Sequence, residues 1–200
     1  MKDLVLATRN RGKIEEFRRI LDDLAPGSIR LLGLDKFPDT NDVEETGESF
    51  EENSLLKARS ICAETGLPAI ADDSGLCVEA LYGAPGIYSA RFAGTHGDDA
   101  ANNVKLLQEL ANVPDGKRSA YFICVTSLVM PDGREITREG RFYGSILHEP
   151  VGKNGFGYDP LFQPDGFTIS SAQMSATEKD AISHRGKSLR AIAPFVLEML

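Results

Sequence analysis

Apolar runs and helix-like repeats alternate along the first part of the chain. Residues 4–7 form an uninterrupted apolar run, typical of a buried strand. After a polar loop, apolar residues recur at helical spacing over 14–24. A short strand is expected around Ile29 to Leu32, and it precedes an acidic, turn-rich stretch over 35–47. The pattern predicts a strand, a loop, a helix and a second strand.

A second helix and a third strand are expected next. Ser49 and Glu52 match a capping box, in which Ser49 caps the helix and Glu52 reaches back to the cap. The apolar helical face over 55–62 continues until Gly66. A short apolar strand follows, and we expect it to end at the two aspartates of 72–73. A separate apolar extended segment is expected over 76–78.

The second half of the chain adds a hairpin and further helices. The pattern predicts a helix over 98–110, strands over 121–130 and 135–143 around a Pro-Asp-Gly turn, and a final amphipathic helix over 189–199. Strand–helix units are therefore mixed with a hairpin. We expect one α/β domain, residues 1–200, with a mixed sheet.

Composition narrows the class of protein. Hydrophobic residues make up 42% and charged residues 26%, and no apolar run approaches the ~18 residues of a membrane span. The N-terminus lacks the pattern of a secretory signal, so we expect a cytoplasmic protein. The net charge of -8 disfavours duplex nucleic acid as a partner. Cys62, Cys77 and Cys124 lie in apolar stretches and are expected to be reduced core residues.

Two segments carry candidate phosphate and metal ligands. The loop from Thr8 to Lys13 leads into a helix, whose free N–H groups and dipole attract phosphate, although a plain solvated loop has the same pattern. Asp72 and Asp73 beside an apolar strand favour compensation by a divalent cation, with Glu45 as a further oxygen ligand. The alternative is an ordinary turn or helix cap.

Two further segments offer groups that recognise a base. Residues 152–160, Gly-Lys-Asn-Gly-Phe-Gly-Tyr-Asp-Pro, combine a flexible backbone with the aromatic ring of Phe156, which is suited to stacking on a base or to the core. His184 and Arg185, expected just before the last helix, are donors for carbonyl oxygens or an ordinary surface pair. Asn53 and Lys57 project from one side of their helix. P-loop, dinucleotide-binding, zinc and acyl-transfer motifs are absent.

Seven short motifs, in order, resemble the inosine triphosphate pyrophosphatase family over nearly the whole chain. They are TRNRGK at 8–13, EETG at 44–47, ENSLLKAR at 52–59, ADDSGL at 71–76, PGIYSAR at 85–91, GFGYDP at 155–160 and ISHR at 182–185. The resemblance implies an elongated, twisted mixed sheet flanked by helices, with two lobes and a central cleft, and a homodimer.

The resemblance also implies the roles of individual residues. Glu45 and Asp73 would bind Mg²⁺, with Asp72 in reserve, and Asp73 would activate the water as general base. The residues implied to contact the substrate are Thr8, Arg9, Asn10, Arg11, Gly12, Lys13, Ser74, Phe156, Gly157, Tyr158, Asp159, Lys179, His184 and Arg185. Asn53, Lys57 and Lys153 are additional candidates for phosphate contacts.

The implied reaction converts deaminated purine triphosphates, ITP, dITP and XTP, to the monophosphate and pyrophosphate. Attack at the α-phosphorus would expel pyrophosphate, and donors aimed at the 6-oxo group would select the base. Two alternatives remain, a pyrophosphatase for modified pyrimidine triphosphates and a nucleotide-binding sensor without turnover. The ISHR motif favours a purine, and the intact carboxylates favour an enzyme.

Overall fold

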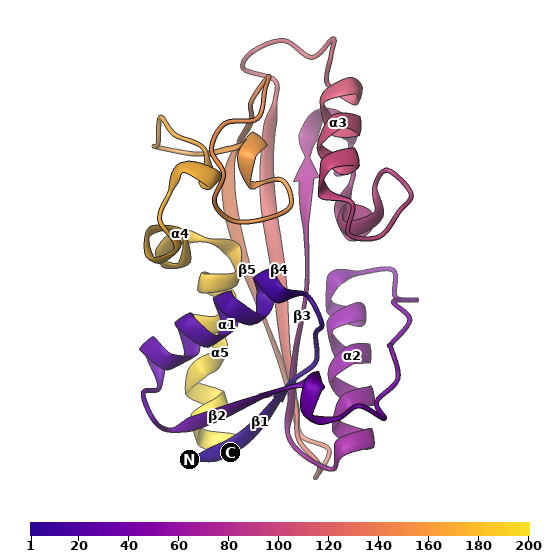
Figure 1. Ribbon diagram of the computed structural model, residues 1–200, viewed down its shortest axis with the longest axis vertical. Helices are drawn as coiled ribbons and strands as arrows, with labels where there is room; N and C mark the ends of the chain where they lie inside the picture. Colours follow the sequence, from indigo (N-terminus) through magenta and orange to yellow (C-terminus); the bar gives the residue numbers. More distant parts are fainter. The chain divides into compact units, whose positions relative to one another are not determined.

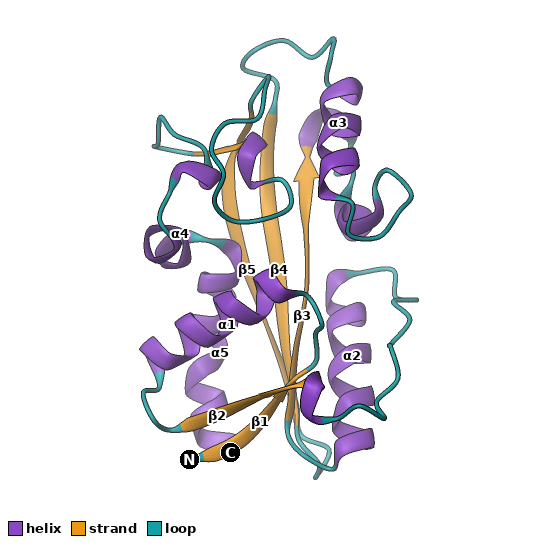
Figure 2. Cartoon of the chain, viewed as in Figure 1, coloured by secondary structure: helices purple, strands orange, loops and turns teal.

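The structure, a computed structural model, describes residues 1–200 and contains one six-stranded sheet (Figures 1 and 2). The strands are β1 (Lys2–Leu6), β2 (Ile29–Gly33), β3 (Ala69–Val78), β4 (Ser119–Val129), β5 (Glu135–Ile146) and β6 (Phe162–Pro164). The helices are α1 (Arg11–Leu24), α2 (Phe50–Thr65), α3 (Asp99–Glu109), α4 (Ala176–Ile182) and α5 (His184–Met199).

The order of strands in the sheet is β2-β1-β3-β4-β5-β6. β1 runs parallel to β2 and β3, whereas β5 and β6 are antiparallel, so the sheet is mixed. This confirms the expected α/β class with a mixed sheet and flanking helices. None of the helices has the length and apolar character needed to cross a membrane.

The chain divides into two compact units. The first unit comprises residues 1–73, 124–140 and 185–200, and the second comprises 74–123 and 141–184. β3, β4 and β5 each contribute residues to both units. The two units agree in number with the two lobes that the resemblance implies.

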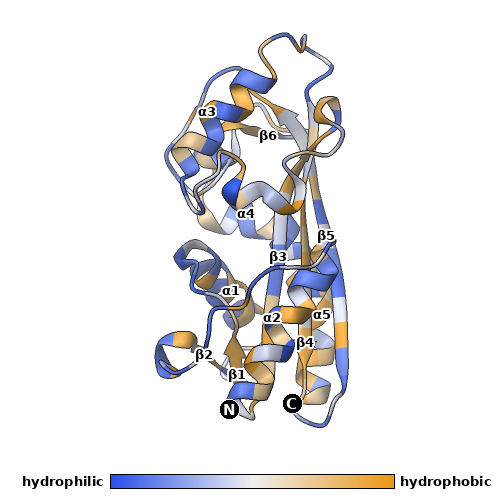
Figure 3. Ribbon diagram, turned by 90° about the vertical axis from the view of Figure 1, so that its right-hand side faces the viewer, coloured by the Kyte–Doolittle hydropathy of each residue, from blue (hydrophilic) through white to orange (hydrophobic).

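The first unit has helices on both faces of its strands. Successive residues of a strand point to opposite faces, and β1 shows this directly. Leu4 and Leu6 pack in a core cluster with residues of α1 and α5, whereas Val5 packs in another with residues of α2. Figure 1 shows α2 on the opposite side of these strands from α1 and α5. The apolar residues of β1 and α5 are visible in Figure 3.

The second unit has a single core cluster rich in aromatic residues. Leu106 of α3 and Leu110, which directly follows this helix, pack there with side chains of β3, β4 and β5. Phe162 of β6 lies with its ring centroid 4.7 Å from that of Phe122 and 5.2 Å from that of Phe142. These tilted pairs add to the burial of apolar area and fix β6 at the edge of the sheet.

Several predicted boundaries are corrected by the structure. β3 does not end at the aspartates of 72–73 but continues to Val78. Ser49 caps α2 by accepting the Glu52 N–H, yet the Glu52 carboxylate accepts the N–H of Glu48 rather than that of the cap. α5 begins at His184, so the His-Arg pair lies in its first turn rather than before it. α4 and β6 carried too little periodicity to be predicted.

Candidate active site

Asp72 and Asp73 lie side by side in the middle of β3, and both are buried. Neighbours on a strand point to opposite faces, so the two carboxylates meet different partners. Asp72 contacts residues of α1 and α5, and Asp73 contacts residues of α2. The same alternation that separates the two apolar clusters of the first unit therefore separates the two carboxylates.

Asp72 is neutralised by two cations. Its Oδ2 atom lies 3.0 Å from Lys13 Nζ and 2.9 Å from Arg185 Nη2. Burial alone would raise its pKa, but Lys13 and Arg185 outweigh burial and hold the pKa well below its usual range. The other oxygen, Oδ1, is buried and accepts no hydrogen bond from the protein. The ion-pair network with Lys13 and Arg185 therefore favours the charged form of Asp72.

Asp73 is held in a different electrostatic state. Asn53 Nδ2 donates to its Oδ2 at 3.2 Å, and Lys57 Nζ lies 3.6 Å from its Oδ1. Burial raises the pKa of Asp73, the negative charges of Glu45 and Asp72 raise it further, and Lys57 and Lys13 offset this only in part. Adjacent carboxylates with pKa values pushed in opposite directions are a frequent feature of acid–base sites.

Glu45 joins this group through Lys57, whose Nζ lies 2.5 Å from Glu45 Oε1. Burial would lower the pKa of Lys57, but Asp73 and Glu45 raise it on balance, so the ammonium stays charged. Protein side chains do not form a three-ligand metal centre here. Mg²⁺ needs only one or two carboxylates when phosphate and water complete its shell, so Glu45 and Asp73, which already share one cation, fit this ion.

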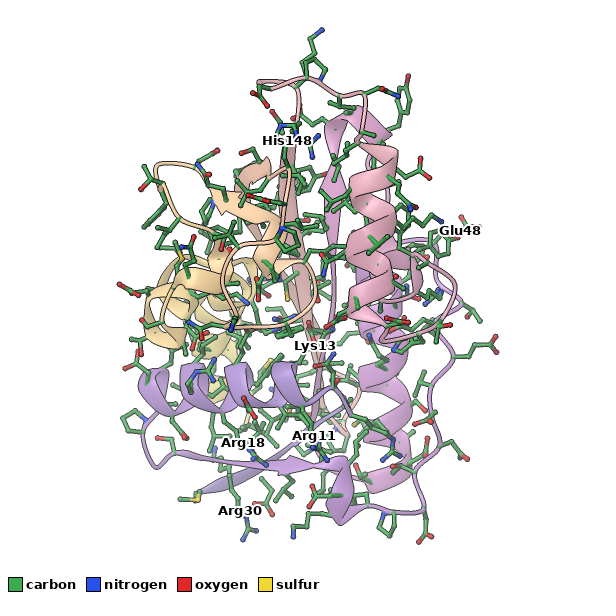
Figure 4. All side chains as sticks on the ribbon, turned by 45° about the horizontal axis from the view of Figure 1, so that its top comes forward. Arg11, Lys13, Arg18, Arg30, Glu48 and His148 are labelled. Carbon is green, nitrogen blue, oxygen red and sulfur yellow. The ribbon has the colours of Figure 1, made fainter.

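The loop before α1 is ordered by its own side chains. Asn10 caps the helix by accepting the Lys13 N–H at 3.1 Å, and Thr8 Oγ1 accepts the Asn10 N–H at 3.2 Å. Figure 4 shows Lys13 on one side of α1 and Arg11 on the other. The Lys13 side chain thus reaches Asp72 from the start of the helix, where the free N–H groups and dipole favour an anion.

Arg9, from the same loop, contacts the acidic segment before Glu45. Its Nε donates to Asp42 Oδ1 at 2.7 Å and its Nη2 to the Thr40 carbonyl at 3.1 Å. Both side chains are well exposed, which makes this a weak link between two loops. The predicted phosphate contact of Arg9 stays a prediction.

A second group of predicted residues lies in the second unit, around a buried ion pair. Lys179 Nζ lies 2.5 Å from Asp159 Oδ2, which also accepts the Phe156 N–H at 3.0 Å. A Cβ on Gly155 would lie 2.1 Å from the same oxygen, and its φ is 74°, so glycine is needed there. Lys179 Nζ also lies 5.1 Å from the centroid of the Phe156 ring.

The rest of this segment is anchored to its own unit. The Gly157 N–H donates to Asp99 at 2.8 Å, and Tyr158 is a core residue whose hydroxyl donates to the Ser89 carbonyl at 2.9 Å. Ser74 follows Asp73 in β3 and is half-buried. The exposed Lys153 donates its N–H to the Ala172 carbonyl.

His184 and Arg185 are neighbours in sequence with different surroundings. His184 belongs to the second unit and stacks on Phe122, with ring centroids 4.8 Å apart. Arg185 belongs to the first unit and is buried between Asp72 and Glu16. The sequence reasoning missed Glu16, because an acidic residue next to the apolar stripe of α1 looks like an ordinary surface position.

Comparison with known proteins agrees with the motif resemblance. The Ham1 family model matches residues 4–195. The dITP/XTP pyrophosphatase of Streptomyces avermitilis is 54% identical over 200 residues, which is all of both chains. The solved Ham1 protein of Coxiella burnetii has a TM-score of 0.87 at 41% identity, covering 99% of this chain and 100% of its own. That of Staphylococcus aureus has a TM-score of 0.85 at 41% identity and full coverage of both.

These matches confirm the predicted relationship, because they extend over the full chain rather than over one motif. The residues of the seven motifs all lie within the matched range. From its sequence and its fold alike, this chain belongs to the Ham1 family.

Proposed function

We propose that this chain is a Mg²⁺-dependent pyrophosphohydrolase that converts dITP, ITP and XTP to the monophosphate and pyrophosphate, and so removes deaminated purines from the nucleotide pool. The observation that carries the proposal is the group of Glu45, Asp73 and Lys57, with the anion Asp72 beside it. The names of the relatives, dITP/XTP pyrophosphatases, support the same substrate class.

In the proposed reaction, Asp73 accepts a proton from a water molecule as the water oxygen bonds to the α-phosphorus. The bond from that phosphorus to the bridging oxygen breaks, and pyrophosphate leaves with the bonding electrons. A carboxylate with a raised pKa is suited to hold the proton, because the best catalytic pKa lies near the working pH. Lys13 and Lys57 stabilise the charge that builds up on the phosphate oxygens.

Magnesium held by Glu45 and Asp73 would supply positive charge against the phosphate oxygens and the leaving group. The loop from Thr8 to Lys13 contributes backbone N–H groups for the triphosphate. Lys57 lies beside both Glu45 and Asp73, and its single positive charge offsets part of their repulsion.

We also propose that the second group of residues reads the base. Lys179 and His184 are buried donors, and Phe156 offers an aromatic face. Donors aimed at the 6-oxo group would reject ATP, whose amino group leaves them without an acceptor, by about 10⁴-fold or more. The resemblance further leads us to propose a cytoplasmic homodimer acting on small nucleotides, with neither nucleic acid nor membrane as a partner.

The test is pyrophosphate release from ITP, XTP, GTP, ATP and a modified pyrimidine triphosphate at equal concentration, with Mg²⁺ and then with EDTA. We expect fast release from ITP and XTP, slow release from GTP and ATP, and loss of all release with EDTA. Tight binding of ITP without release would favour a nucleotide sensor. Faster release from modified pyrimidine triphosphates would overturn the purine assignment.

A further inference from the structure

Asn53 is a fully buried amide in the first turn of α2, and both ends of its side chain are engaged. Its Oδ1 accepts the Gly47 N–H at 2.8 Å, and its Nδ2 donates to Asp73 Oδ2 at 3.2 Å. Gly47 lies two residues after Glu45. One side chain therefore links the segment that carries Glu45 to the carboxylate of Asp73.

The orientation of this amide is fixed by its partners. A backbone N–H can only donate and an ionised carboxylate can only accept, so the amide oxygen faces Gly47 and the NH₂ group faces Asp73. A flipped amide would lose both hydrogen bonds and leave two buried groups unsatisfied, which disfavours it strongly. The two oxygens of Asp73 thereby acquire different partners, Asn53 on Oδ2 and Lys57 beside Oδ1.

The segment before α2 is shaped to make this contact. A Cβ on Gly47 would lie 2.7 Å from Asn53 Oδ1 and 2.7 Å from Glu52 Cβ. Any larger residue at 47 must move away from the helix, and the hydrogen bond to Asn53 would lengthen. The close approach of Gly47 to α2 therefore serves its hydrogen bond with Asn53 as well as the turn before the helix.

The frame that carries Asn53 is rigid. The next residue, Ser54, is fully buried, and its Oγ contacts the Ala71 carbonyl at 3.2 Å and Ser127 Oγ at 2.8 Å. These bonds tie α2 to β3 and β4 one residue away from the Asn53–Asp73 contact. A side chain on a fixed frame can hold a reacting group in one direction, which catalysis requires.

We propose that Asn53 is a positioning residue for the proposed hydrolysis: it fixes the direction of the Asp73 carboxylate and sets the distance between Asp73 and the Glu45 segment. This inference rests on the proposed function. It assigns Asn53 a role through Asp73 rather than a contact with phosphate, because both ends of its amide are already bonded within the protein.

The chain offers a matched control in Asn102 of the second unit. Asn102 is also a buried helical asparagine, whose Oδ1 accepts the Ala93 N–H at 2.7 Å and whose Nδ2 donates to the Ala90 carbonyl at 3.3 Å. It holds a loop to α3 just as Asn53 holds a loop to α2, but it contacts no carboxylate. Asn102→Ala therefore reproduces the structural lesion without touching Asp73.

The experiment compares wild type with Asn53→Ala, Asn53→Asp, Gly47→Ala and Asn102→Ala. The readouts are kcat and KM for ITP with Mg²⁺, melting temperature, and Mn²⁺ affinity by electron paramagnetic resonance without nucleotide. For Asn53→Ala we expect kcat to fall about 100-fold with KM little changed, and Mn²⁺ affinity to fall about tenfold. Gly47→Ala should lower kcat and Mn²⁺ affinity by smaller factors. Asn102→Ala should lower only the melting temperature.

Asn53→Asp separates the two ends of the link, since it keeps an acceptor for Gly47 but cannot donate to Asp73. We expect its kcat to fall as far as that of Asn53→Ala. Wild-type kcat in Asn53→Asp, or melting loss without change in kcat and Mn²⁺ affinity in Asn53→Ala, would overturn the inference. If wild type releases no pyrophosphate, the proposed function fails, and Mn²⁺ affinity in Asn53→Ala and Gly47→Ala still decides the role of Asn53.

Discussion

Each unit of this protein contains a lysine paired with carboxylate, buried in the second unit and half-buried in the first, yet the two sites are built differently. In the second unit, Lys179 and Asp159 form a close pair, and the Phe156 N–H donates to the same carboxylate. In the first unit, Lys57 faces both Glu45 and Asp73. The first site gathers more negative charge around its lysine than one cation can neutralise.

The pair of Lys179 and Asp159, which we call the clamp, holds a loop in place. The group of Glu45, Asp73 and Lys57 is the proposed reactive site. A carboxylate with a cation and an N–H bond is satisfied, and it holds the loop of 155–159 in one shape. Burial raises the pKa of Asp73, and the nearby carboxylates of Glu45 and Asp72 add to the rise, whereas Lys13 and Arg185 outweigh burial and lower the pKa of Asp72. We therefore expect substitutions in the first unit to affect turnover most, and those in the second unit to affect base selection and loop order.

The largest effect is expected for Asp73→Asn, which removes the proposed base while keeping the shape of the side chain. Loss of a general base costs about 10²- to 10⁴-fold in rate. Since the pKa of Asp73 is raised in the folded state, its charged form opposes folding at neutral pH. The variant should melt at the wild-type temperature or above, while pyrophosphate release from ITP nearly disappears.

The pH dependence of stability provides the control for Asp73→Asn. A raised folded-state pKa means that wild type gains stability as pH falls through that pKa, because protonation relieves the cost. Any stability advantage of the variant should therefore shrink as the pH is lowered, in thermal melts at several pH values. Near-normal turnover in a folded Asp73→Asn protein would disprove the proposed role of this carboxylate.

Asp72→Asn is expected to act on stability as strongly as any substitution in the cluster. It leaves the buried Arg185 and the half-buried Lys13 without their shared anion, and breaking a buried pair from one side costs about 3–5 kcal/mol. The free energy of unfolding from urea titration measures this. A loss below about 1 kcal/mol would mean that water or Glu16 compensates the two cations.

The ion pairs around Asp72 and Asp73 explain which parts of the molecule could be predicted from sequence. β1 and α1 follow local periodicity, so their positions were clear. β3 was divided in two because a pair of aspartates looks like the end of a strand, and only the cations of α1, α2 and α5 make burial possible. The pairing of Arg185 with Glu16, 169 residues apart, leaves no local pattern. The residues alone indicate Asp72, Asp73 and Glu45 as candidate metal ligands, whereas the choice of Glu45 and Asp73 as the pair, and of Asp73 as the base, comes from the family motifs.

A smaller effect is expected when the clamp of the second unit is broken by Lys179→Met. Asp159 keeps the N–H of Phe156, so the loss is that of a hydrogen bond to a charged group, about 1.5–3 kcal/mol of folding free energy. If this group reads the base, KM for ITP should rise more than kcat falls, and the preference for ITP over ATP should narrow. Steady-state kinetics with both nucleotides test this, with Lys117→Met as an exposed lysine control in the same unit.

The smallest effect is expected for Arg9→Ala, which removes an exposed ion pair between two loops. Such pairs contribute about 0–1 kcal/mol, and the Arg9 and Asp42 side chains are 49% and 86% exposed. If Arg9 only ties the loops together, Asp42→Ala should have the same small effect on stability and KM, and the double variant should add nothing further. If Arg9 instead binds the triphosphate, Arg9→Ala alone should raise KM for ITP, and the rise should diminish at high salt. Comparison of the three variants at two ionic strengths decides between a loop contact and a third phosphate-binding cation beside Lys13 and Lys57.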